Sequence, residues 1–213
     1  MKAMPIYLND LGIVCALGRG KTEVATRLLA GDISGMIRTD DYSPGRILTL
    51  GVVSSALPPI RTKTPAHHSR NNRLLLGALE EIHPTVDALR ERVSPHRFGV
   101  VVGTSTSGIA EAEQAITYLH DRGSLPPGFH YGQQEIGNPA QFLADVLGIS
   151  GPAYVVSTAC SSGVKVLASA ARLLRLGVCD AVLAGGADSL CRFTIAGFSA
   201  LEGSAANAAI HSA

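Results

Sequence analysis

A cysteine at position 160 is the residue of this 213-residue chain that is best placed to do chemistry. It follows a strand-like run at 153–157 and precedes an Ala- and Leu-rich segment at 163–176 that closes at Gly177. The pattern predicts a buried strand, a sharp turn and a long helix, with Cys160 at the junction. Unpaired helix amides and the positive end of the helix dipole favour an anion there. We therefore expect a thiolate that can carry an acyl group as a thioester.

An inert core thiol is the alternative for Cys160, because most cysteines in apolar sequence are small buried residues. The other three cysteines, Cys15, Cys179 and Cys191, fit that description. Cys160 differs in its neighbours, which are small from Ser157 to Gly163 and would let backbone or substrate approach closely. None of the cysteine spacings matches a metal site or a CxxC motif, which is typical of a reduced, cytoplasmic protein.

The elements that must position this cysteine alternate between strand and helix patterns, which predicts an α/β fold. Continuous apolar residues at 98–102 predict a strand buried on both faces. Pro84 is expected to break a helical pattern that runs from Asn72 to Leu89, and Pro139 to open the helix that ends near Gly148. Further extended segments are predicted at 6–16, 47–54 and 181–184, and further helices at 21–30, 109–119 and 163–176.

Two motifs in register resemble the nucleophile region of the β-ketoacyl-acyl-carrier-protein synthases, the condensing enzymes of fatty acid and polyketide assembly. The first is TACSS at Thr158–Ser162, and the second is DAVLAGGAD at Asp180–Asp188. The resemblance extends upstream to residues 97–105 and to Asn138-Pro139. It covers residues 5–202, which is nearly the whole chain.

The resemblance implies a thiolase-like α/β fold, of which this chain would form the N-terminal half. That half is a mixed sheet with helices on both faces, and it makes up one half of a layered αβαβα architecture. The helix at 163–176 is apolar nearly all round, so we expect a second layer to cover it in the intact fold. Residues 1–202 are thus predicted to be the N-terminal half of a synthase, and residues 203–213 a tail unlike the family.

The resemblance also implies the chemistry. The intact protein would be an acyltransferase, a 3-oxoacyl-acyl-carrier-protein synthase with Cys160 as catalytic nucleophile. It would condense the acyl thioester on Cys160 with malonyl-acyl-carrier-protein by a decarboxylative Claisen reaction, in fatty acid or polyketide-type biosynthesis. The family's two catalytic histidines belong to the second half, so this chain is expected to be truncated and to lack them.

Two further residues are expected to bind the acyl chain by resemblance: Thr106, in the turn Gly103–Gly108, and Phe198. A tight strand-to-helix turn and an ordinary core phenylalanine remain the alternatives for these two positions. No metal or organic cofactor is expected, because the phosphopantetheine arm of an acyl carrier protein delivers the substrates.

The acyl carrier protein is therefore an expected partner, and the synthase is expected to form a homodimer or a synthase-type heterodimer. Two other functions remain open. One is a non-catalytic, chain-length-type partner of an active synthase, against which the retained Cys160 counts. The other is a thiolase, which shares the fold and a cysteine nucleophile.

Composition argues against several other classes. A net charge of +1 and the absence of tryptophan give no basis for nucleic-acid binding. The segment Gly18–Thr22 lacks the first glycine of a P-loop, because that position is Cys15. The pair His67-His68 lies among Lys, Arg and Pro and is expected to be solvated. Neither a membrane-spanning apolar run nor a secretory pattern is present, so we expect a cytoplasmic protein.

Overall fold

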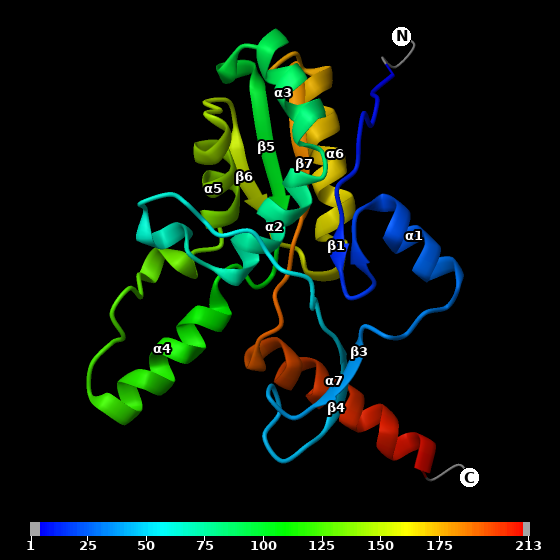
Figure 1. Ribbon diagram of the computed structural model, residues 1–213, viewed down its shortest axis with the longest axis vertical. Helices are drawn as coiled ribbons and strands as arrows, with labels where there is room; N and C mark the ends of the chain where they lie inside the picture. The colour runs from blue at the N-terminus through cyan, green and yellow to red at the C-terminus, as the bar shows by residue number, and fades with distance from the viewer. Residues whose placement is uncertain (1–4, 211–213) are drawn as a thin grey trace.

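A three-stranded parallel sheet forms the centre of the molecule, in the order β6-β5-β7 (Figure 1). The computed structural model describes residues 5–210, with side chains described as far as Leu201. β5 (Phe98–Gly103) lies between β6 (Ala153–Val156) and β7 (Ala181–Gly186) and is buried along its whole length. The predicted apolar strand is thus the central strand of the sheet.

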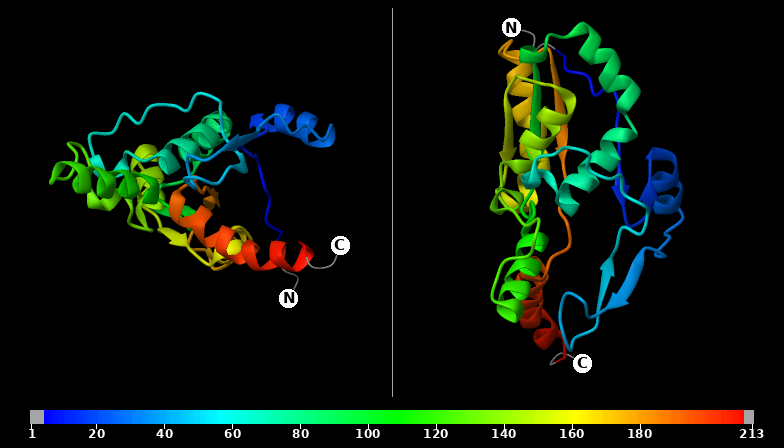
Figure 2. Two further views of the ribbon diagram at one scale, coloured as in Figure 1. Left: turned by 90° about the horizontal axis from the view of Figure 1, so that it is seen from below. Right: turned by 60° about the vertical axis from the view of Figure 1, so that its left-hand side comes forward.

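Helices cover both faces of this sheet, as predicted (Figures 1 and 2). On one face, Phe98, Val100 and Val102 belong to a core shared with α2 (Arg70–Glu80), α3 (His83–Arg92) and α5 (Asn138–Leu147). On the other face lies α6 (Ser162–Arg175), whose Val166 packs over Gly103. Side chains alternate between the two faces because successive residues of a strand point in opposite directions.

Antiparallel pairing is found in two separate hairpins, and the three strands of the central sheet run parallel where we expected a mixed sheet. β1 (Val14–Cys15) pairs with β2 (Gly18–Arg19), so most of the predicted extended segment 6–16 lies outside a strand ladder. β3 (Met36–Thr39) pairs with β4 (Leu48–Gly51), which lies within the predicted segment 47–54. β3 itself was not predicted, because its residues are mostly exposed and lack an apolar alternation.

The helix boundaries follow the proline and glycine signals. α2 ends at Glu80 and α3 begins at His83, with Pro84 in its first turn, so the predicted break is confirmed. α1 (Lys21–Leu29) precedes Gly31, and α4 (Ile109–Arg122) ends at Gly123 in the left-handed conformation. Short 3-10 turns complete the helices: η1 (Pro65–His67), η2 (Pro95–Arg97), η3 (Tyr131–Gln133) and η4 (Ala159–Ser161).

α4 and α7 (Arg192–Ile210) lie below the sheet in Figure 1. The Glu113 carboxylate of α4 accepts hydrogen bonds from the amides of Arg192 (2.9 Å) and Phe193 (2.7 Å), and so caps the start of α7. α7 runs past the predicted family boundary at residue 202, and residues 211–213 of the predicted tail lie outside the described residues. Within residues 5–210, none of the helices combines the length and apolar character needed to cross a bilayer.

Candidate active site

Cys160 lies where the sequence predicts it, between a strand and a helix. β6 ends at Val156, the chain turns through η4, and α6 begins at Ser162. Its side chain is exposed, whereas Cys179 and Cys191 are buried in the core. Cys160 is therefore not a buried core residue in the described part of the chain, and its role as a nucleophile stays a prediction.

Hydrogen bonds hold the turn before Cys160 in a strained conformation. Ala159 has φ of 52°, a left-handed value that costs a residue with a Cβ about 1–2 kcal/mol. The Ser162 hydroxyl accepts from the Thr158 amide (2.9 Å) and donates to the Ala159 carbonyl (2.8 Å). The Ser161 hydroxyl donates to the Thr158 carbonyl (2.8 Å). The serines on the C-terminal side of Cys160 therefore fix the turn that exposes this cysteine.

A second strained turn leaves the same edge of the sheet. Gly103 of β5 pairs with Val156 of β6 and with Gly186 of β7, so the carboxyl ends of all three strands meet. In the turn after β5, Ser107 has φ of 43°. Ser107 and Ala159 are the two non-glycine residues with positive φ in the described part of the chain. Backbone strain of this kind is concentrated at functional sites, so this edge is the candidate site on geometry alone.

Thr106 belongs to this second turn. It is only 2% exposed, and its hydroxyl donates to Asp188 (3.1 Å) and accepts from the Ser189 amide (3.1 Å). The alternative of a tight strand-to-helix turn therefore describes its conformation well. Its contact with an acyl chain stays a prediction.

Phe198 lies on α7, the helix below the sheet in Figure 1. Its side chain is 60% exposed, so it is not a core phenylalanine within the described residues. Acyl binding by Phe198 likewise stays a prediction.

Asp188 is a residue of this edge for which the sequence indicates a structural turn but no role in the site. Its carboxylate accepts hydrogen bonds from the turn after β5, at residues 104–106. The available signal was its place as the last residue of the DAVLAGGAD motif, two residues after the end of β7. The pattern alone did not show which turn the carboxylate would hold.

His67 is buried, at 3% exposure, which corrects the expectation that the histidine pair is solvated. Its Nδ1 lies 3.2 Å from the Thr62 hydroxyl and its Nε2 3.3 Å from the Asp145 carboxylate. Burial lowers the pKa of the imidazole, while the nearby Asp145 charge acts in the opposite direction. His68, its neighbour, is exposed as expected.

The buried histidine belongs to a polar cluster that reaches the second turn. Asn72 donates to the His67 carbonyl (2.9 Å) and to the Asn138 side chain (2.8 Å). Asn71 lies beside it, with its amide 3.5 Å from the Thr104 hydroxyl. The cluster ties the start of α2 to α5 and to the turn after β5.

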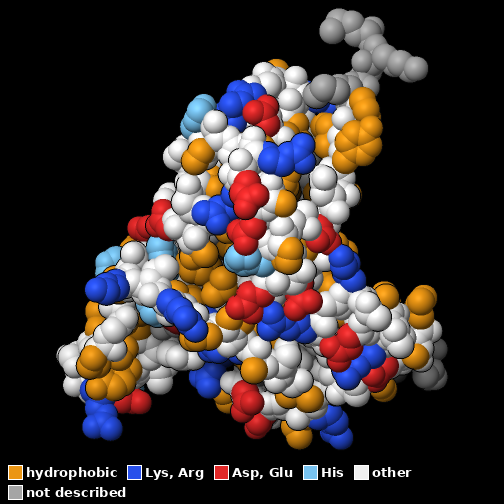
Figure 3. Space-filling view, turned by 45° about the horizontal axis from the view of Figure 1, so that its top comes forward, with side chains coloured by type: hydrophobic (Ala, Val, Ile, Leu, Met, Phe, Trp, Pro, Cys, Tyr) orange, Lys and Arg blue, Asp and Glu red, His pale blue; other side chains and the backbone are white. Residues whose placement is uncertain are grey.

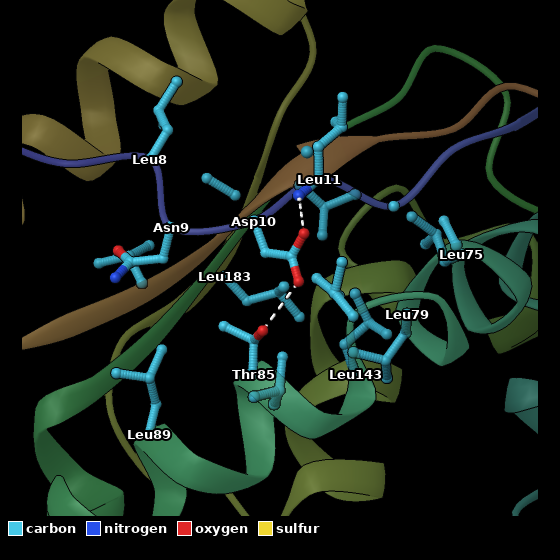
Figure 4. A pocket seen from close by; sticks show the side chains of 18 of the residues that line it. Leu8, Asn9, Asp10, Leu11, Leu75, Leu79, Thr85, Leu89, Leu143 and Leu183 are labelled. Carbon is cyan, nitrogen blue, oxygen red and sulfur yellow. Dashed lines mark hydrogen bonds between the residues drawn. The ribbon is translucent and has the colours of Figure 1, made fainter. Parts of the chain in front are cut away.

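An apolar cavity of about 370 Å³ lies along β7, between the N-terminal segment and α2 and α3 (Figure 4). Asp10 stands in its wall and accepts from the Leu11 amide and the Thr85 hydroxyl, both at 2.8 Å. Hydrogen bonds from Lys21 and Thr85 lower the pKa of Asp10 to about 2. The predicted site residues Cys160, Thr106 and Phe198 are not among the residues that line this cavity.

On the face shown in Figure 3, acidic and basic side chains are interspersed. Among the side chains that the structure describes, as far as Leu201, no three His, Cys, Asp or Glu side chains gather as a metal site would require. The groups available for chemistry at the sheet edge are therefore a thiol, hydroxyls, backbone amides and one carboxylate.

Comparisons with known proteins agree with this geometry. The family model "Beta-ketoacyl synthase, N-terminal domain" matches residues 52–213. Nodulation protein E of Rhizobium leguminosarum bv. trifolii is 28% identical over 86% of this chain and 47% of its own length. The chloroplastic 3-oxoacyl-[acyl-carrier-protein] synthase I of Arabidopsis thaliana is 31% identical over 86% of this chain and 40% of its own. The chain thus spans less than half the length of these two relatives.

A solved structure of a ketosynthase, ApeO, in complex with its chain length factor, ApeC, from Xenorhabdus doucetiae is also similar. The match has a TM-score of 0.86 and 41% identity, and covers 92% of this chain and 50% of that one. The predicted thiolase-like fold, in its N-terminal half, is confirmed by this match. With the family model matched over 52–213 and the exposed cysteine in the TACSS turn, this chain belongs to the β-ketoacyl synthase family and carries its N-terminal domain.

Proposed function

We propose that this chain is the nucleophile-bearing part of a β-ketoacyl-acyl-carrier-protein synthase, with Cys160 as the catalytic nucleophile. The observation that carries the proposal is the exposed thiol in a strained turn at the start of α6. Backbone amides at the start of a helix have no partner within the helix and attract negative charge. The same amides suit a reaction that develops negative charge beside the sulfur.

The proposed first step is acyl transfer. The Cys160 thiolate attacks the carbonyl carbon of an acyl thioester, and a tetrahedral intermediate forms with its negative charge on oxygen. The Cys160 amide contributes a hydrogen bond to that oxyanion. The intermediate collapses with cleavage of the bond to the pantetheine sulfur, whose thiolate takes up a proton and leaves. The acyl group remains on Cys160 as a thioester.

The proposed second step is condensation. Malonyl-acyl-carrier-protein loses carbon dioxide, and the carbanion formed attacks the acyl carbonyl on Cys160. The cysteine sulfur departs as thiolate, and 3-oxoacyl-acyl-carrier-protein is the product. The histidines and the second oxyanion donor for this step are proposed to lie outside the 213 residues, because the chain spans less than half of its curated relatives.

The proposed partners follow from the same relatives. Acyl carrier protein is named in the 3-oxoacyl-[acyl-carrier-protein] synthase of A. thaliana. A synthase-type heterodimer is supported by the ketosynthase and chain length factor complex, and a homodimer is the alternative. The retained Cys160 favours the catalytic subunit over a non-catalytic chain-length-type partner.

Acyl loading tests this proposal. The full 213-residue chain is incubated with hexanoyl-pantetheine and weighed by intact-protein mass spectrometry. We expect one hexanoyl group on the wild type and none on Cys160→Ala. Cys15→Ala is the matched control and should load like the wild type, because Cys15 lies far from the strand edge in sequence and is half-buried.

Addition of malonyl-acyl-carrier-protein to the loaded chain completes the test. No 3-oxoacyl product should form, because the groups that drive decarboxylation are proposed to lie elsewhere. Loading that survives Cys160→Ala, or no loading of the wild type, would overturn the proposed role of Cys160. A 3-oxoacyl product from this chain alone would show that the groups that drive decarboxylation do not lie outside the 213 residues.

A further inference from the structure

Asp188 brings together two parts of the sheet edge that are far apart in the sequence. One oxygen of its carboxylate, Oδ1, accepts hydrogen bonds from the Ser105 amide at 2.7 Å and from the Thr106 amide at 3.1 Å. The hydroxyls of Thr104 (3.0 Å) and Thr106 (3.1 Å) donate to the same oxygen. Hydrogen bonds to an ionised carboxylate are roughly twice as strong as neutral ones, so this contact fixes the turn after β5.

The turn held by Asp188 is the one that contains Ser107 in a left-handed conformation. The Thr104 hydroxyl accepts from the amides of Thr106 (3.2 Å) and Ser107 (3.0 Å), which closes the turn on itself. A strained residue persists only where its surroundings determine its conformation. Asp188 lies two residues after the end of β7 and supplies that constraint from outside the turn.

The same turn borders the support of Cys160. Gly103, the last residue of β5, lies directly before the turn and pairs with Val156, the last residue of β6. The first turn of α6 packs over it, since a Cβ placed on Gly103 would lie 3.3 Å from the Ser162 Cβ. Ser162 in turn holds Thr158 and Ala159, the residues before the nucleophile. The turn after β5 therefore lies beside the loop of Cys160, with Gly103 and Ser162 between them.

We propose that Asp188 is a positioning residue for acyl transfer, which holds the turn 104–107 in register with the loop that carries Cys160. This inference rests on the proposed function. Asp188 does not touch the reacting atoms in this assignment. Its carboxylate sets where the wall of the acyl site stands relative to the sulfur.

The experiment compares two reactions of Cys160 in the full chain. Hexanoyl-pantetheine must bind the site before it reacts, whereas iodoacetamide is small and reports only on the thiol and its turn. We expect Asp188→Ala to slow hexanoyl transfer about tenfold, since small displacements of a positioned substrate are costly in rate. The rate of alkylation by iodoacetamide should change less than twofold.

A matched control lies at the other end of the same strand. Asp180 precedes β7, pairs with Arg97 and is also exposed, but it is remote from the strand ends that meet near Cys160. Asp180→Ala should leave both rates unchanged. Asp188→Asn keeps an acceptor oxygen without the charge and should give an intermediate rate, and it serves if Asp188→Ala does not fold.

A double-mutant cycle links the effect to the turn. Thr106→Val removes one hydroxyl that donates to Asp188. The decreases in the rate of hexanoyl transfer caused by Thr106→Val and by Asp188→Ala should therefore be less than additive in the double variant. Unchanged hexanoyl transfer in Asp188→Ala would overturn the proposal, and so would an equal loss in both reactions or strict additivity. A wild-type chain that alkylates but never loads would instead overturn the proposed function, and this result is recognised before any Asp188 variant is made.

Discussion

Single residues at the sheet edge are held in conformations that the backbone alone would avoid. Ala159 and Ser107 both have left-handed φ, and each lies in a turn that follows a strand of the central sheet. Hydroxyl and carboxylate groups of nearby residues stabilise both turns. The strain is therefore balanced by side-chain hydrogen bonds, and the exposed thiol is one result of that balance.

His67 shows how a single buried group sets a pH dependence. Its pKa in the folded chain is lowered from 6.5, chiefly by burial, so the unfolded chain binds a proton that the folded chain resists. The free energy of unfolding should therefore not depend on His67 above pH 6.5. It should decrease as the pH falls below 6.5, because the unfolded chain then takes up a proton at this residue. Asp145 and His68 are the charged or titratable groups that act on this imidazole.

Urea titrations between pH 5 and 8 check this expectation. His67→Gln should flatten the pH dependence in that window, whereas His68→Gln removes only the smallest of the effects on this imidazole and should alter it less. An NMR titration of the wild-type protein measures the pKa of the His67 imidazole directly. A His67 pKa at or above 6.5 in the folded chain would contradict the prediction.

Close backbone contact between two strands determines which positions of β7 require glycine. A Cβ placed on Gly186 would lie 2.5 Å from the carbonyl oxygen of Gly103, a distance at which the backbone must move. A Cβ placed on Gly185, one residue earlier, would meet no atom within 4 Å. Two adjacent glycines of β7 thus have opposite requirements.

Alanine substitutions separate the two glycines. Gly186→Ala should lower the free energy of unfolding by about 1–3 kcal/mol, in the range of overpacking a close contact. Gly185→Ala is the control and should change it by less than about 0.5 kcal/mol. Chemical denaturation measures both values, and equal effects of the two substitutions would contradict the close approach.

At the scale of the whole molecule, one face of α6 is exposed to solvent. Val164 is 74% exposed and Leu167 is also exposed, whereas Val166 between them is fully buried against the sheet. Within the described part of the chain, the helix is thus covered by the sheet on one face and open on the face that carries Val164. This agrees with the expectation from the family resemblance that a second layer covers it in the intact fold.

The open face should bind a hydrophobic dye such as ANS when the 213-residue chain is alone. Val164→Ser and Leu167→Ser are expected to reduce dye fluorescence with little loss of stability, because both side chains already contact water. Val166→Ala should cost about 2 kcal/mol, because it leaves a cavity in the core. Unaltered dye fluorescence in both serine variants would show that the dye binds another surface.

The sequence by itself determined the local elements and the candidate nucleophile. The strand, turn and helix around Cys160, the buried strand at 98–102 and the break at Pro84 are all confirmed, although the strand before Cys160, β6, is half-buried where a buried strand was expected. Each depends on residues within one or two turns of chain, where side-chain periodicity, proline geometry and helix-end amides act directly. The resemblance to the synthases rests on the same local motifs and is confirmed by the family match.

Only the tertiary structure decided which distant residues complete the edge of the sheet. Thr106 and Asp188 are 82 positions apart, and the parallel order β6-β5-β7 brings them together. The same packing buries His67, although its neighbours in the sequence are polar and charged. Strand order and long-range packing depend on contacts between segments that share no local pattern, so neither Asp188 nor His67 could be assigned its place from the sequence.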